Sequence, residues 1–395
     1  MKITFLGHSA NDLFWFILPL ILPSLLSRFD LSYTQGGGIL TLYLGVTAVG
    51  SYVLGRVSDR IARKEILGYG FLVASGGLIA AGFAGTLSLF LLLIAVTAVG
   101  VSTFHPVSYA LIDESTLSGK GRVLGIFESY GTAAILAMFL INGYLIESVG
   151  VRGVLIITAL PALIMGILFL RAGQIPVVIV PPVAAAETAA TAARGRPRYR
   201  EGSYLVLGLF LAAIILRVLS VSAVVNFLPT IFVDHIGFGR STASYATALY
   251  FLGGLSGSLV AARFADRVNS YLVLIVASVM LIGALTAFSL NLPKLIYPFL
   301  VLILGMFGSG SLINQNLLLT RLGTGLGKGA VFGLMMALMT VTSSLAPTLF
   351  GLVTDTAGFT VALSAAAGPV SLGALLLSAL WSAERSFQKG NSVVK

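Results

Sequence analysis

The sequence contains no cysteine and only three histidines. Without thiols it can form no disulfide, no thiolate nucleophile and no cysteine metal site, and three scattered histidines give little support for metal chemistry. Charged residues are also scarce, at 10% of the chain against ~25% in ordinary soluble domains. Hydrophobic residues make up 57%, and the mean hydropathy is +1.01. A water-soluble fold could not cover so much apolar surface, so we expect a membrane protein.

The sequence patterns of common hydrolases are missing as well. Neither Gly-x-Ser-x-Gly nor His-Glu-x-x-His occurs. We therefore expect no enzyme activity, no cofactor and no metal centre. In a soluble protein the net charge of +10 could indicate nucleic acid binding, but basic residues of membrane proteins gather in cytoplasmic loops, so we expect no nucleic acid partner.

Long apolar runs fill most of the chain. A spanning helix needs ~20 mostly apolar residues. Twelve such runs are found, over residues 4–27, 35–57, 65–85, 87–111, 122–147, 152–171, 203–232, 241–264, 270–290, 295–320, 329–352 and 359–382. The first run contains Asp12, which favours a spanning helix over a cleaved signal peptide. We predict an all-α membrane protein with twelve transmembrane helices.

The Lys and Arg residues between these runs fall mainly on one side. If the N-terminus is cytoplasmic, nineteen lie inside and only Arg28, Arg152, Arg240 and Lys294 lie outside. The excess of positive charge predicts a multi-pass protein of the inner membrane with both termini in the cytoplasm. We expect membrane lipids as neighbours and a monomer as the working state.

Residues 172–202 interrupt the apolar runs. This stretch is rich in Ala and Pro and ends in a basic run over residues 194–200. Such a composition is typical of a linker on the cytoplasmic side. The predicted organisation is therefore an N-terminal six-helix bundle over 1–171, a linker over 172–202 and a C-terminal six-helix bundle over 203–395.

The two predicted bundles repeat each other. A shift of 207 residues aligns Tyr43 with Tyr250 and Gly50 with Gly257, and a shift of 208 aligns 119–125 with 327–333. Because both copies start on the same side of the membrane, they predict a pseudo-twofold axis along the membrane normal. That symmetry is typical of transporters whose substrate site lies between the two halves.

A loop motif carries a resemblance to a known family. Residues 55–64 read Gly-Arg-Val-Ser-Asp-Arg-Ile-Ala-Arg-Lys, which resembles the signature between helices 2 and 3 of the major facilitator superfamily. The resemblance implies that family's fold and a gating role for four motif residues, Gly55, Asp59, Arg60 and Arg63. The second repeat keeps Asp266 and Arg267 but lacks the trailing Arg-Lys, so we expect stronger gating ion pairs in the first half.

A narrower resemblance points to fosmidomycin-resistance-type exporters. It rests on His8, Asn11-Asp12 and Leu22-Pro23 in the first run, on Phe104-His105-Pro106 in the fourth, and on Ala346-Pro347, Gly351 and Asp355 in the eleventh. It implies proton-driven export of a drug or small anion. Many antiporters of the superfamily carry a Gly-Pro pair in helix 5, whereas this chain reads Gly131-Thr132-Ala133-Ala134, so uptake by proton symport stays open.

Three titratable residues fall at similar depth in the first half. At 1.5 Å per residue, Asp12, His105 and Glu128 lie roughly 12–13 Å from the cytoplasmic helix ends. Ionisable groups in hydrocarbon cost ~2.5–3.5 kcal/mol on insertion scales and often serve proton relays. We predict proton coupling through these three. The alternatives are a structural partner for Glu128, helix capping for Asp12, and a neutral His105 bonded to a carbonyl freed by Pro106.

A second group of polar residues is predicted to bind substrate. Arg217 lies near the membrane midplane and could bind a carboxylate or phosphonate, or else pair with Asp12 or Glu128. The other predicted contacts are Asn226, Asn314, Gln315 and His8. Hydrogen bonding between helices is the alternative for the three amides, and a position at the membrane interface is the alternative for His8.

These observations predict a proton-coupled secondary transporter of a small, anionic or drug-like molecule that works by alternating access as an exporter. Uptake of a nutrient or organic anion by proton symport is the nearest alternative. A lipid scramblase or a receptor-like membrane protein is the alternative from a different class. The expected partners are the small-molecule substrate, protons and membrane lipids.

Overall fold

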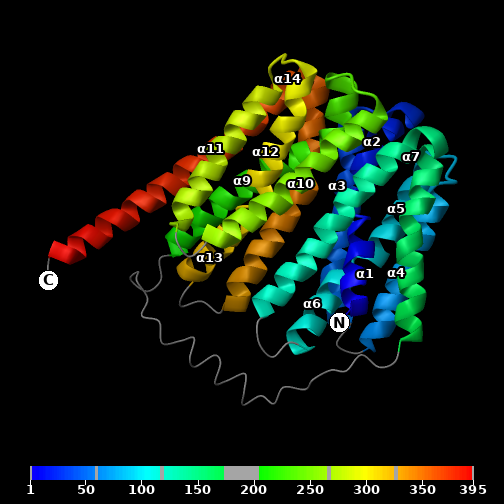
Figure 1. The fold of residues 1–395 in the computed structure, drawn as a ribbon, viewed down its shortest axis with the longest axis horizontal. Coiled ribbons are helices and arrows are strands. Elements are labelled where there is room, and N and C mark those ends of the chain that lie inside the picture. The colour runs from blue at the N-terminus through cyan, green and yellow to red at the C-terminus, as the bar shows by residue number, and fades with distance from the viewer. Residues whose placement is uncertain are drawn as a thin grey trace. The chain divides into compact units, whose positions relative to one another are not determined.

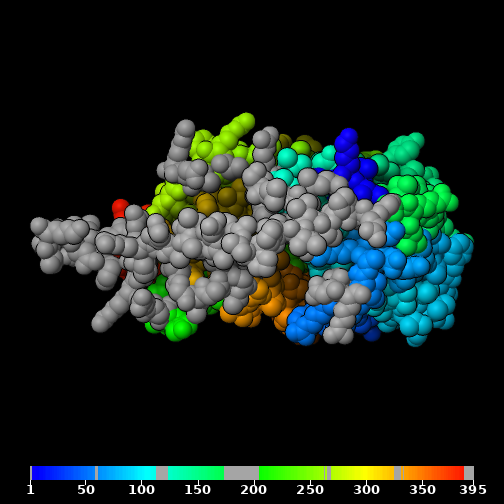
Figure 2. Space-filling view, turned by 90° about the horizontal axis from the view of Figure 1, so that it is seen from below, coloured from blue at the N-terminus to red at the C-terminus, as the bar shows by residue number. Residues whose placement is uncertain are grey.

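The computed structural model describes residues 2–57, 61–115, 120–172, 204–264, 268–323 and 328–393, which are coloured by position in Figure 1 and Figure 2. Within these ranges the regular structure is entirely helical. The predicted all-α class is therefore confirmed.

The described residues of the first half form seven helices. They are α1 (Lys2–Asp12), α2 (Ile17–Phe29), α3 (Tyr33–Val57), α4 (Arg63–Ala81), α5 (Leu87–Val101), α6 (Phe104–Ser115) and α7 (Lys120–Arg171). The second half contains α9 (Tyr204–Thr230), η1 (Ile231–His235), α10 (Arg240–Phe264), α11 (Ser270–Phe288), η2 (Lys294–Ile296), α12 (Tyr297–Ser309), α13 (Leu312–Leu322) and α14 (Lys328–Val393).

Nine helical stretches of the described residues are long and apolar enough to cross a membrane. Two of them contain a glycine at positive φ, Gly150 (φ 63°) and Gly358 (φ 82°), where the chain turns between consecutive spans. Glycine reaches this conformation without the steric penalty of a Cβ. Divided at these glycines, and with α10 included, the stretches match the twelve predicted ranges one for one.

Three of the predicted spans are each built from two helices. The first is interrupted at residues 13–16, the fourth at 102–103 and the tenth at 310–311. In the fourth, Pro106 has no N–H, so the carbonyl of Ser102 loses its helical partner. The Ser51 hydroxyl donates to that carbonyl at 3.1 Å. The span is thus broken next to Pro106, and α3 supplies the donor for the freed carbonyl.

The chain forms two compact units. Unit 1 comprises Met1–Ile17, Gly45–Met138 and Val149–Glu201, and unit 2 comprises Leu18–Leu44, Phe139–Ser148 and Gly202–Lys395. In unit 1, α4 packs closely on α5, because a Cβ on Gly100 would overlap the backbone of Ala74. Glycine at such a position lets two membrane helices approach each other.

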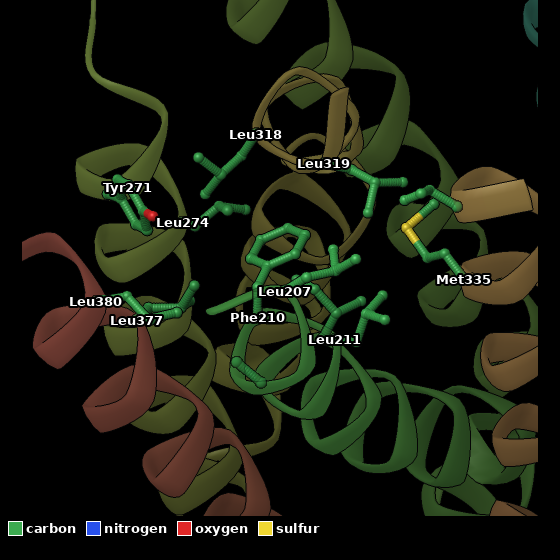
Figure 3. Close-up of a cluster of buried hydrophobic side chains, with 13 residues drawn as sticks. Leu207, Phe210, Leu211, Tyr271, Leu274, Leu318, Leu319, Met335, Leu377 and Leu380 are labelled. Atoms are coloured by element: carbon green, nitrogen blue, oxygen red, sulfur yellow. The ribbon is translucent and has the colours of Figure 1, made fainter. Parts of the chain in front are cut away.

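In unit 2, α9 packs along α14, and α11 lies against α12 and α14 (Figure 1). A cluster of buried apolar side chains fills the space between these helices. Figure 3 shows Phe210 from α9, Tyr271 from α11, Leu318 from α13 and Leu377 from α14 within this cluster. In a bilayer such packing is held by close van der Waals contact, since lipid tails are as apolar as leucine.

The predicted linker and most of the gating motif lie outside the described residues. This applies to residues 173–203 and to Asp59, Arg60, Asp266 and Arg267. Gly55 and Arg63 are described. A Cβ on Gly55 would lie 3.2 Å from the Pro106 Cβ, so the first motif residue packs directly on α6.

Candidate functional site

Two imidazoles contact one carboxylate inside unit 1. His8 and Asp12 lie one turn apart on α1, and His105 comes from α6. The His8 Nε2 atom is 3.3 Å from Asp12 Oδ2, and the His105 Nε2 atom is 3.3 Å from Asp12 Oδ1. We call these three residues the Asp12 cluster. Two of the three predicted proton-coupling residues are thus in contact, together with one predicted substrate residue.

His8 is the enclosed member of the cluster and is held in a fixed orientation. Its Nδ1 lies 2.6 Å from the Phe127 carbonyl oxygen, which can only accept, so Nδ1 carries the proton. The ring stacks on Phe127 at 3.9 Å between centroids, and its Nε2 is left facing Asp12. The side chain is 0% exposed, so His8 is enclosed by protein. This burial does not give its depth in the membrane, so the substrate role and the interfacial position both stay predictions.

His105 connects the cluster to a more accessible surface. Its Nε2 accepts the Trp15 indole N–H at 3.2 Å and lies 3.3 Å from the Asn11 amide nitrogen. These partners are side chains, whereas the alternative for His105 was a carbonyl freed by Pro106. Sequence reasoning missed Trp15, because it lies in the apolar run Leu13–Phe16 that the structure breaks into a turn.

The three donor atoms of the Asp12 cluster lie within 4.8 Å of one another, which is close enough for one metal ion. The lone pair of His105 Nε2 that would bind the ion already accepts the Trp15 N–H. A proton on this nitrogen would need the same lone pair, so the Trp15 contact does not decide between a metal ion and a proton.

Gly131 of α7 makes room for the Asp12 carboxylate. A Cβ at this position would overlap Asp12 Oδ2 and would lie 2.8 Å from His8 Cε1. The backbone of α7 therefore passes directly against the cluster, with space for hydrogen only. In the sequence, Gly131 is one small residue within a long apolar run, and nothing in that run predicts its contact with Asp12.

Glu128, the third predicted proton carrier, lies apart from Asp12. Its Oε1 accepts the Tyr109 hydroxyl at 2.6 Å, and its side chain is exposed. The Tyr109 ring stacks on the His105 ring at 5.8 Å between centroids. Tyr109 therefore links Glu128 to the Asp12 cluster. Expected in the apolar interior, Glu128 instead reaches an open surface of unit 1.

Arg217 binds the broken helix of unit 2. Its guanidinium donates to the carbonyls of Phe307, at the end of α12, and Gly308, the latter at 3.0 Å, and to the Ser311 hydroxyl. These carbonyls lie at a helix end, which leaves them without helical partners and concentrates partial negative charge. In the described part of its own unit, no carboxylate contacts Arg217. The predicted pairing with Asp12 or Glu128 would join two units and stays a prediction.

The predicted amides of unit 2 also make local contacts. The Asn226 side chain donates to the Ser222 carbonyl at 2.8 Å, and Gln315 lies 3.5 Å from the sulfurs of Met335 and Met339. Asn314 is buried, and its Oδ1 has no hydrogen-bond partner among the described residues. The Gln315 contacts fit the alternative of hydrogen bonding between helices, whereas the Asn226 contact lies within α9, and a substrate role for all three stays a prediction.

A further polar cluster within unit 2 joins the start of α3 to α14. The Asp355 carboxylate accepts hydrogen bonds from Tyr33 and Thr34, and the Thr41 hydroxyl donates to the Ser344 carbonyl at 2.5 Å. A Cβ on Gly351 would overlap the Tyr33 carbonyl. The two helices are therefore in backbone contact along this stretch.

Two curated proteins of Bacillus subtilis (strain 168) resemble parts of the chain. The putative niacin/nicotinamide transporter NiaP is 33% identical over 147 residues, which are 37% of this chain and 37% of NiaP. The uncharacterised transporter YwoD is 26% identical over 162 residues, covering 41% of this chain and 36% of YwoD. The matches thus span little more than a third of these relatives' lengths.

Solved structures resemble the whole chain. A bacterial homologue of the human lysosomal transporter Spinster superposes with a TM-score of 0.75 at 15% identity, covering 98% of this chain and 97% of that one. A D-xylose-proton symporter superposes with a TM-score of 0.76 at 14% identity, covering 96% of each chain. At such low identity these likenesses show the fold alone.

The sequence profile of the Major Facilitator Superfamily matches the chain twice, over residues 4–219 and 209–394. The two matches agree with the internal repeat and with the helical architecture. The narrower likeness to fosmidomycin-resistance-type exporters receives no such support. The relatives and solved structures that the chain resembles are named as transporters, and the chain itself is a multi-pass membrane protein that belongs to the Major Facilitator Superfamily.

Proposed function

We propose that the chain couples the transport of its small molecule to protons by alternating access, and that it exports this molecule from the cell. The observation that carries the proposal is the Asp12 carboxylate, which is 3.3 Å from an imidazole on each side within a membrane-spanning bundle. Carboxylates and imidazoles inside a membrane are the usual members of proton relays.

The arrangement gives protons a route. It begins at His105, whose side chain is 22% exposed, and Glu128 adds a negative charge nearby, because the Tyr109 hydroxyl donates to Glu128 while the Tyr109 ring stacks on His105. His105 contacts Asp12, and Asp12 contacts the enclosed His8. A proton taken up at the surface can thus be held deeper in the bundle, where its charge alters the ion-pair balance of α1 against α6 and α7.

Several predicted features belong to the same proposal. The bundles over 1–171 and 203–395, joined by the linker, are the moving parts, with both termini cytoplasmic in the inner membrane of the cell. The working state is a monomer surrounded by lipid. Gly55, Asp59, Arg60 and Arg63 close one face, and Asp266 and Arg267 are their weaker counterparts in the second repeat.

The cargo is a small organic molecule. Arg217 carries a positive charge that no carboxylate of the described part of its unit balances, which favours an anionic group nearby. Asn226, Asn314 and Gln315 supply further polar atoms in unit 2. Likeness to NiaP, named as a niacin/nicotinamide transporter, makes small heteroaromatic rings the first compounds to try.

Uptake by proton symport is the second candidate. The observation that favours it is the helix over residues 131–134 of α7, which lacks the Gly-Pro pair of many antiporters and stays regular. The direction of transport therefore needs its own measurement, because the resemblance to exporters rests on short motifs such as that of the first helix.

The test is transport of nicotinamide and nicotinate into liposomes under an imposed pH gradient. In the wild type, reversing the gradient should reverse the direction of net movement. Asp12→Asn should retain binding but lose the gradient dependence, and Glu128→Gln should lose the gradient dependence as well. The sign of the response in the wild type separates export from symport. Transport that ignores the gradient in every variant would rule out proton coupling.

A further inference from the structure

The start of α7 exposes two stripes of opposite character. Gly125, Glu128, Ser129 and Thr132 follow one another at helical spacing, and all four are at least partly exposed. Ile126 and Tyr130 lie about 200° around the helix from Glu128 at 3.6 residues per turn, and they are 45% and 42% exposed. One exposed stripe is therefore polar and the other apolar.

In a membrane these two stripes need different surroundings. An apolar stripe can face lipid, whereas a carboxylate in hydrocarbon costs ~2.5–3.5 kcal/mol on insertion scales. Glu128 lies inside a candidate span, Val123–Arg171. Because Glu128 is exposed, its stripe is more stable facing water than lipid, on a side that a polar cargo can also reach.

Aromatic rings continue the polar stripe across unit 1. The Trp15 ring lies 5.7 Å from the His105 ring, and the His105 ring stacks on the Tyr109 ring at 5.8 Å. The Tyr109 hydroxyl then holds Glu128 Oε1. We call Trp15, His105, Tyr109 and Glu128 the aromatic–acid face. Each of the four is partly or fully exposed.

A rigid layer lies beneath the aromatic–acid face. His8, Phe104 and Phe127 are at most 1% exposed and stack on one another. The exposed rings are therefore held in place before any ligand arrives, and a preorganised surface loses little entropy on binding.

The free atoms of this face define the cargo it fits. Glu128 Oε2 has no hydrogen-bond partner among the described residues, and it is an acceptor beside the Tyr109 ring. The neighbouring indole and phenol offer π faces. Aromatic faces attract planar rings and cations, and a carboxylate attracts N–H donors and positive charge.

The geometry points to the aromatic–acid face as the substrate contact of unit 1, selecting planar aromatic compounds that carry a cationic or N–H-donating nitrogen group. This inference rests on the proposed function, because it names the cargo of the same path. It departs from the anionic cargo that Arg217 favours. A donor group of the cargo that binds a Glu128 oxygen also prevents a proton from binding that oxygen. Cargo and proton therefore compete for the same atom.

Trp15 makes the inference directly measurable. The chain has two tryptophans, and Trp381→Phe leaves Trp15 as the single tryptophan, which can be excited selectively over the tyrosines. The purified full chain with this substitution is titrated, without any gradient, with benzamidine, nicotinamide and nicotinate. Free tryptophan amide corrects for absorption by the probes. We expect saturable quenching that is strongest with the benzamidine cation, weaker with nicotinamide and weakest with nicotinate.

Variants then assign the contact. Glu128→Gln should weaken benzamidine binding about tenfold or more, since a charge-assisted hydrogen bond is lost, and Glu128→Asp should keep part of it. Tyr109→Phe should weaken it as well, because Glu128 loses its anchor. Tyr130→Phe, on the opposite stripe, is the matched control and should leave binding unchanged.

Two results would overturn the inference: nicotinate binding as tightly as benzamidine, or Glu128 and Tyr109 variants that leave all three affinities unchanged. If these variants fold poorly, the wild-type order of the three probes decides alone. If the probes bind in the expected order but transport does not depend on the gradient, proton coupling is contradicted and this inference still holds. If a cargo is transported in response to the gradient but never quenches Trp15, this inference is contradicted and proton coupling still holds.

Discussion

The Asp355 carboxylate caps the start of α3 from a helix more than 300 residues away in sequence. It accepts the backbone N–H of Tyr33 at 2.9 Å and that of Thr34 at 2.7 Å, and the Thr34 hydroxyl also donates to it. The first N–H groups of a helix lack internal partners, and a negative charge there is favourable. This single side chain therefore ties α3 to α14 within unit 2.

Replacing Asp355 should loosen that tie. In Asp355→Ala the amides of Tyr33 and Thr34 lose their acceptor, so we expect their hydrogen exchange to become about tenfold faster, in line with the loss of a helix cap. Asp355→Asn keeps one acceptor oxygen, so its exchange rate should lie between those of the wild type and Asp355→Ala. The measurement is hydrogen–deuterium exchange of the peptide over residues 30–40. Unchanged protection in the alanine variant would show that Asp355 does not hold this helix end.

Gly131 offers a test of the Asp12 cluster that alters no titratable group. In Gly131→Ala the new methyl group would displace the Asp12 carboxylate, while alanine itself is favourable in a helix. We expect gradient-driven transport to fall at least tenfold with little change in thermal stability.

Gly125→Ala is the matched control on the same helix, because a Cβ there meets nothing within 4 Å. Both variants are assayed in liposomes under the same pH gradient. Equal activities would mean that the position of the Asp12 carboxylate does not matter for transport.

Arg217 should contribute to stability before any substrate is present. Arg217→Met removes the donors of the carbonyls of Phe307 and Gly308 while keeping a long side chain. The Ser311 hydroxyl can still donate to one of these carbonyls, so one buried acceptor is left without a partner, and we expect the free energy of unfolding to fall by about 1–3 kcal/mol.

The readout is thermal unfolding of the purified protein in detergent without added compounds. Arg263→Met, an exposed arginine of α10 in the same unit, is the control and should change little. If Arg217→Met proves as stable as the wild type, its carbonyl contacts are incidental and a role in binding substrate alone becomes the better account.

Most of the fold could be predicted from the sequence, because membrane helices can be recognised by their length and hydropathy. The break next to Pro106 was also predictable, since proline removes a specific backbone donor. The turn around Trp15 was not, because Leu13–Phe16 is apolar and reads as the middle of a helix. Only the contacts of Trp15 with His105 and of its backbone with Asp12 explain why the chain turns there.

The candidate site was predictable in its residue types but not in its pairings. Asp12 and His105 could be singled out, because ionisable groups are rare in apolar runs. The enclosure of His8 depends on Phe127, which lies 119 residues away in the chain. The partners of Arg217 are mainly backbone carbonyls, which every residue possesses, so no sequence pattern could reveal them.

Proton flux through Asp12 is the most direct test of the central claim. A pH-sensitive dye sealed inside liposomes reports proton movement when a gradient of nicotinamide or benzamidine is applied across wild type, Asp12→Asn and the control Glu147→Gln. We predict that wild type and Glu147→Gln move protons with the compound, and that Asp12→Asn still moves the compound but carries no protons. Proton movement by Asp12→Asn equal to that of the wild type would contradict the account.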